Sequence, residues 1–133
     1  MKVKTSDLNG AALDWAVAKI ENPEWWEDGY MDGDPLAALD MDDGEAYAPS
    51  STWSQGGPII EREGINLSVD YQDSALSNDM VQIGWKGNLW NNSVPGTAGF
   101  LQWAYGPTPL IAAMRCFVTS KLGNEVDVPE ELT

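Results

Sequence analysis

Two stretches of the chain, residues 47–57 and 105–115, contain most of the side chains suited to binding chemistry. The first holds hydroxyl groups, aromatic rings and two adjacent glycines, and the second holds a tyrosine, a Gly-Pro-Thr-Pro sequence and an arginine. Arginine suits bidentate contact with a phosphate, and aromatic faces can stack on a nucleobase. We predict a ligand-binding site whose residues are Tyr47, Ser50, Thr52, Trp53, Gln55, Gly56, Gly57, Tyr105, Gly106, Thr108 and Arg115.

The Gly-Pro-Thr-Pro sequence is typical of a helix start. Thr108 can accept a hydrogen bond from the first helical turn, and Pro109 then occupies the first helical position. A helix start has free N–H groups and the positive end of the helix dipole, so it can also bind an anion. Gly56 and Gly57 precede a proline and can present N–H groups in a turn. Both patterns also occur in plain caps and turns without a ligand, and the two interpretations stay open.

Catalytic chemistry has little support in the residue types. The chain has no histidine, the usual general base near neutral pH and a common metal ligand. Cys116 lies in an apolar helical pattern without a histidine partner, which makes it a poor nucleophile. Glu61 and Glu63 could hold Mg²⁺, but a strand with alternate exposed acids would have the same pattern. We therefore predict no catalytic residue, no metal and no cofactor.

An excess of acidic residues is the main feature of the composition. The chain has 7 Lys and Arg against 21 Asp and Glu, for a net charge of −14. A turn-rich segment at about residues 22–46 concentrates this charge, and its DMDDGE sequence lacks the twelfth-position glutamate of a calcium-binding EF-hand loop. Such a surface should repel nucleic acid and anionic membranes. The segment is either a solvated loop or a face that binds a basic protein through residues 24–45.

The length and the hydrophobic content predict one domain, residues 1–133, with a core of its own. No apolar run reaches the roughly 18 to 20 residues that span a membrane, and no secretory signal is visible at the start. The single cysteine cannot form an internal disulfide. These features are typical of a cytosolic protein.

The periodicity of apolar residues predicts the secondary structure. We expect a short strand at KVK, a helix from Ser6 or Asp7 to Glu21, and a turn at residues 56–58. Alternating residues predict strands at 65–71 and 81–85, followed by a loop at 87–99 and a strand at 100–105. A second helix spans residues 109–121, and EVDVP forms a last short strand. This order predicts an α+β fold, with two main helices packed on a small antiparallel sheet.

Three blocks carry a resemblance to a known family. They read KTSDLNGAALDWAVAK, YAPSSTWSQGGPIIEREGI and GPTPLIAAMRCFVTSKLGNEVDVPEEL. In this order they resemble the NinX-like family of small phage proteins, which carries a domain-of-unknown-function label. The resemblance implies a phage accessory protein that acts in the cytoplasm of the bacterial host cell, and it implies no activity. The acidic segment and the 87–99 loop depart from the usual spacing of the family.

Three hypotheses on function follow. The first is a non-enzymatic homo-oligomer that binds a small nucleotide-derived ligand, and so sequesters a host defence signal. The second is an acidic, DNA-mimic-like protein that inhibits a basic DNA-handling protein. The third is a Mg²⁺-dependent phosphoesterase that uses Glu61 or Glu63. We favour the first, because hydroxyls, glycines, aromatic rings and the scarce arginines fall together in the two later family blocks, residues 47–65 and 106–132.

Overall fold

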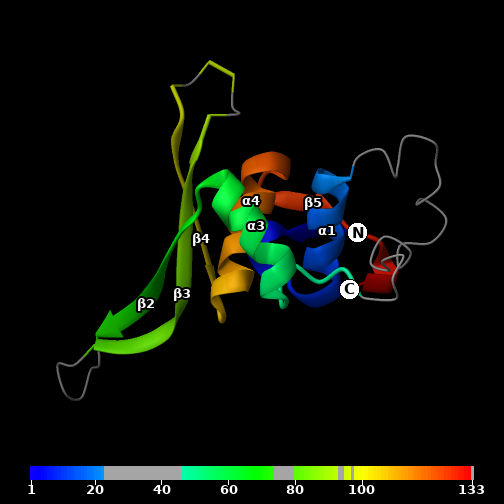
Figure 1. Ribbon diagram of the computed structural model, residues 1–133. Helices are drawn as coiled ribbons and strands as arrows, with labels where there is room; N and C mark the ends of the chain where they lie inside the picture. Colours follow the sequence, from blue (N-terminus) through cyan, green and yellow to red (C-terminus); the bar gives the residue numbers. More distant parts are fainter. Residues whose placement is uncertain (23–45, 74–79, 93–94, 97, 133) are drawn as a thin grey trace.

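The computed structural model describes the chain except residues 23–45, 74–79, 93–94, 97 and 133. The described part has a three-stranded antiparallel sheet with the helices packed to one side of it, and a second, two-stranded sheet (Figure 1). This arrangement confirms the predicted α+β class. The elements are β1 (Lys2–Lys4), the 3₁₀ turn η1 (Thr5–Asp7), α1 (Gly10–Glu21), α3 (Trp53–Glu63), β2 (Asn66–Asp73), β3 (Met80–Asn91), β4 (Phe100–Gly106), α4 (Pro109–Leu122), β5 (Glu125–Asp127) and the 3₁₀ turn η3 (Glu130–Leu132).

The three-stranded sheet has the order β2-β3-β4, with both pairs antiparallel. The three predicted strands are present, and an irregularity in register lies opposite Asp70 and Tyr71. The predicted loop at 87–99 is wrong at its start, because β3 continues to Asn91. Gly87 and Leu89 are buried there, and a Cβ at Gly87 would stand 3.2 Å from the Leu67 side chain on β2. Close packing therefore holds this glycine-containing stretch in the sheet.

Helix α4 is the centre of the fold. It packs against β3 and β4 on one side, and α1 and α3 contact it from the other. Met114, Phe117 and Val118 are fully buried as a result. Its start is as predicted, since Thr108 Oγ1 accepts a hydrogen bond from Ile111 N at 3.1 Å.

The first helix begins later than predicted. Residues Thr5–Asp7 form the 3₁₀ turn η1, and the α-helix begins only at Gly10. The Thr5 hydroxyl donates to the Gly123 carbonyl at 2.6 Å, and Thr5 N donates to the Asn124 carbonyl at 2.8 Å. These bonds tie the turn to the end of α4 and keep Thr5 out of the helical pattern.

The predicted turn at residues 56–58 is wrong, because these residues lie within helix α3. Gly56 is buried against the Pro49 carbonyl and Leu110, and Ile59 on the same helix is also buried. The packing of this face outweighs the local preference of Gly-Gly-Pro for a turn. Glu61 and Glu63 are consequently helical and not on a strand. Helix α3 is thus added to the two predicted helices.

The two ends of the chain meet in the small sheet. Strand β1 pairs antiparallel with β5, as Lys2 opposite Asp127 through Lys4 opposite Glu125. Both strands were predicted, and the pairing places the start of the chain beside the end of α4. None of the helices in the described residues has the length and apolarity of a membrane-spanning segment.

Candidate functional site

A cleft of about 640 Å³ runs along the edge of β4 that no other described strand pairs with. Its walls come from the start of the chain, from β2, β3 and β4 of the sheet, from the flank of α4 and from the start of β5. Its lining residues are Lys4, Thr5, Ser6, Asp70, Ile83, Gly84, Trp85, Gln102, Trp103, Ala104, Tyr105, Gly106, Arg115, Thr119, Asn124 and Glu125.

The predicted site residues do not all come together in this cleft. Tyr105, Gly106 and Arg115 line it. A smaller hollow of about 280 Å³ beside the start of α4 is lined by Ser50, Trp53 and Thr108, among other residues. The remaining predicted residues, which line neither hollow, are Tyr47, Thr52, Gln55, Gly56 and Gly57.

Arg115 is the charged residue best fixed in the cleft. Its Nε donates to the Leu8 carbonyl at 2.7 Å, and its Nη1 donates to the Tyr105 carbonyl at 2.9 Å. No carboxylate within the described residues forms an ion pair with it. Burial lowers the pKa of the guanidinium, while nearby Asp7 favours the charged form. A guanidinium always stays charged in proteins, so Arg115 keeps its positive charge in the cleft, and its two hydrogen bonds use Nε and Nη1 only.

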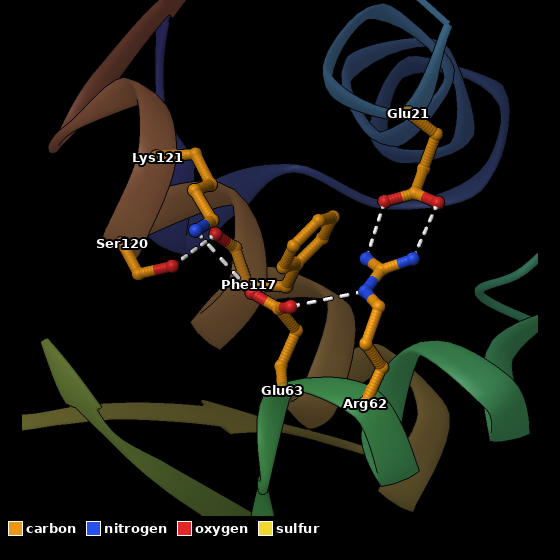
Figure 2. A network of polar contacts seen from close by, with 6 residues as sticks. All are labelled: Glu21, Arg62, Glu63, Phe117, Ser120 and Lys121. Carbon is orange, nitrogen blue, oxygen red and sulfur yellow. Dashed lines mark hydrogen bonds and ion pairs between the residues drawn. The ribbon is translucent and has the colours of Figure 1, made fainter.

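The second arginine, Arg62, is placed very differently (Figure 2). Its Nη1 donates to Glu21 at 2.9 Å and its Nη2 to the other oxygen of the same carboxylate, while its Nε donates to Glu63 at 3.0 Å. Glu63 also pairs with Lys121 at 3.3 Å, and the Arg62 guanidinium lies 5.7 Å from the Phe117 ring. This network joins α1, α3 and α4 and uses all the nitrogens of Arg62. It also engages both oxygens of Glu63, one of the two carboxylates considered for Mg²⁺.

The glycine and threonine at the start of α4 have structural roles of their own. A Cβ at Gly106 would stand 2.8 Å from Ala112 N, so a glycine allows β4 to pass close to α4. Thr108 uses its hydroxyl oxygen to accept from Ile111 N. The sequence left two interpretations of this helix start, a plain cap and an anion site. The structure confirms the cap.

The 47–57 stretch is held by hydrogen bonds to its own polar groups and to α1. Ser50 N donates to Asp14 Oδ1 at 2.9 Å, and Gln55 accepts from Ala48 N and donates to the Ala46 carbonyl. Burial raises the pKa of Asp14, an effect that the hydrogen bonds from Ser50 oppose. Burial also raises the pKa of the Tyr47 hydroxyl to about 12, with Glu21 and Asp14 adding to the rise. Ser50 and Gln55 thus have structural roles here.

Asp14 was missed by reasoning from sequence. Its side chain is buried although it is an acid, and it lies next to the apolar stripe of α1. An acid within a run of residues expected to face the core was the available signal. The cleft residues Lys4, Gln102, Thr119 and Asn124 were also missed. They come from β1, β4, α4 and the turn after α4, and no local pattern connects them.

Cys116 is buried on α4. Its Sγ donates to the Gln102 carbonyl at 3.3 Å, and burial raises the pKa of its thiol to about 12. At neutral pH it is therefore a protonated packing residue. The described residues contain no group of three or more Cys, Asp or Glu arranged to hold a metal ion. The acidic face predicted at residues 24–45 lies entirely outside the described residues.

Comparison with known protein families places the chain. The family model described as Bacteriophage P22, NinX matches residues 4–121. The chain belongs to this NinX phage family. The matched range begins at Lys4 and ends at Lys121, so it includes Arg115 and the strands β2, β3 and β4, but not the cleft residues Asn124 and Glu125. No curated protein matches the chain at a significant level.

Proposed function

We propose that this NinX-family protein binds a small anionic ligand with an aromatic ring, such as a nucleotide derivative, in the cleft along β4. The observation that carries the proposal is the state of Arg115. It is held by two backbone carbonyls and forms an ion pair with no carboxylate of the described residues, in a chain whose net charge is −14. Fixing a guanidinium in advance reduces the ordering cost of binding a phosphate.

The rest of the cleft supplies the other contacts that such a ligand needs. Trp85, on the inner face of β3, contributes aromatic surface, on which a base can stack. Lys4 adds a second cation, while Asp70 and Glu125 are the acids of the lining. The charges of the lining are therefore balanced. A volume of about 640 Å³ lies within the usual range for small-molecule sites.

Binding without turnover agrees best with the chemistry of the lining. It contains two cations, two acids, hydroxyls and amides, but no histidine or cysteine. We propose that the protein sequesters its ligand in the cytoplasm of the bacterial host cell, as a phage accessory protein that lowers the level of a host defence nucleotide. Such a role needs affinity and places no demand on catalysis.

The test is a thermal-shift screen of the full chain against cyclic dinucleotides, cyclic oligonucleotides and ADP-ribose derivatives, with and without Mg²⁺. A ligand at 100 times its dissociation constant adds about 2.7 kcal/mol to the free energy of unfolding. Titration calorimetry on each hit gives the affinity, and chromatography of the recovered ligand shows whether it is intact. No shift with any member of the panel would count against the proposal.

Two variants and one control locate the site. Arg115→Lys keeps the charge but loses the fork of donors, and Lys4→Glu reverses an exposed charge of the cleft lining. Each should weaken binding by about tenfold or more, since a charged hydrogen bond contributes about 1.5–3 kcal/mol. Arg62→Gln is the matched control, because this second arginine lies away from the cleft. An equal loss of affinity in the control would show that the site is elsewhere.

A further inference from the structure

The face of the β2-β3-β4 sheet that points away from the helices carries a row of exposed large side chains. In Figure 1 the helices α1, α3 and α4 all lie on the other side of this sheet. The exposed residues are Trp90 (61%) on β3 and Leu101 (46%), Trp103 (41%) and Tyr105 (55%) on β4. We call these four residues the outer aromatic face.

Strand alternation places the four residues on one surface. Leu89 and Asn91 on β3 are buried while Trp90 between them is exposed, and Ala104 on β4 is buried between Trp103 and Tyr105. Trp90 pairs directly with Leu101 across the two strands. Successive side chains of a strand point to opposite faces, so the outer aromatic face is the surface opposite α4.

Two of these rings are held in place within the chain. A Cβ at Gly99 would stand 2.5 Å from Trp90 Nε1, so the indole packs directly over this glycine. Lys86 Nζ lies 5.7 Å from the centre of the Trp103 ring. Rings that are already ordered lose little conformational freedom when a partner covers them.

We propose that the outer aromatic face is the interface of a homodimer in which two copies of the chain pack these sheets face to face. The exposed area supports an interface of this kind. Aromatic side chains have about 150–250 Å² each, so the four residues offer on the order of 400 Å² per copy at the exposed fractions given. With the polar residues around them, two copies would bury more than about 1,000 Å² in total, the size expected of a specific interface.

Charge selects a second copy as the partner. On this face the described strands carry one cation, Lys86, and one acid, Asp70, whereas the whole chain has a net charge of −14. A polyanion would meet a single cation, and a basic protein would meet a single acid. A second copy brings an equally neutral face. In a two-fold interface Lys86 of each copy can lie near Asp70 of the other, and the two side chains have opposite charges.

The interface is separable from the proposed ligand site. Trp103 and Tyr105 border the cleft, but their rings point to the outer face, and Trp90 and Leu101 do not line the cleft at all. The dimer does not depend on a ligand, and variants of Trp90 and Leu101 leave the cleft unchanged.

Sedimentation velocity of the full chain tests the proposal at protein concentrations from about 1 to about 100 micromolar. This range covers the weakest dissociation constants expected of such interfaces. We expect a species of twice the 14.5 kDa chain mass. Trp90→Glu should raise the dimer dissociation constant at least about 30-fold, as expected of a central interface residue. Trp53→Glu is the matched control, because Trp53 is 55% exposed and lies on α3.

Leu101→Glu serves as a second variant if Trp90→Glu unfolds, as judged by circular dichroism. A wild-type protein that stays monomeric at the highest concentration would overturn the inference, and the face would then belong to another partner. A dimer that survives both Trp90→Glu and Leu101→Glu would overturn it as well, as would a dimer that dissociates only in the Trp53→Glu control.

Discussion

The adjacent glycines of α3 provide a sharp test of the packing described above. Gly56 has no room for a side chain, because an added Cβ would overlap the Pro49 carbonyl oxygen and stand 2.7 Å from Leu110 Cδ2. Gly57 has no atom within 4 Å of the same position. The substitutions Gly56→Ala and Gly57→Ala therefore make the same chemical change in the same helix with different steric outcomes.

The expected magnitudes follow from these surroundings. Alanine is favoured over glycine in a helix interior by about 0.5–1 kcal/mol. At Gly56 the overlap involves backbone that cannot move freely, and overpacking costs about 1–3 kcal/mol, so we expect a net destabilisation of about 1–2 kcal/mol. At Gly57 the following Pro58 disfavours helical backbone once a Cβ is present, which reduces the gain to between zero and about 1 kcal/mol.

Urea unfolding followed by tryptophan fluorescence measures both variants, with thermal melting as a second probe. A difference of about 2 kcal/mol between them corresponds to roughly 5–10 °C in melting temperature for a chain of this size. The packing argument would be refuted if Gly56→Ala were as stable as the wild type. A large loss in Gly57→Ala would refute the helical assignment of this stretch, since a turn with left-handed glycines would tolerate neither change.

Two further predictions concern Asp14 and Thr108. Burial raises the folded-state pKa of Asp14 above its ordinary value of 3.8, so its contribution to stability is fully present below the unfolded pKa and is lost as pH rises through the folded pKa. Asp14→Asn keeps an acceptor for Ser50 N. Its free energy of unfolding relative to wild type should rise between about pH 4 and about pH 7 in urea titrations. An unchanged difference between the two pH values would contradict the burial argument. Thr108→Ala removes the acceptor for Ile111 N and should cost about 1 kcal/mol, whereas Thr108→Ser should cost much less and ligand affinity should stay unchanged in both.

Local patterns in the sequence determined much of the secondary structure. The Thr108-Pro109 start of α4, the alternating strands and the short strands at both ends all depend on neighbours within a few residues. The first helix was predicted to begin too early, and the other two errors have a common cause. At residues 56–58 and 87–91 glycine suggested a turn or a loop, but contacts with distant residues, Leu110 in one case and Leu67 in the other, hold the glycines in regular structure.

The site depended on the tertiary structure. The sequence showed that arginine was scarce, and it could not show that Arg62 is bound by Glu21 and Glu63 while Arg115 is held by carbonyls. The Leu8 carbonyl that Arg115 meets is 107 residues away in the chain. Composition and periodicity thus determined the fold class and the residue types available for binding. Only packing decided which of them share a cleft, because the partners of a buried charge are selected by position in space and not by separation in sequence.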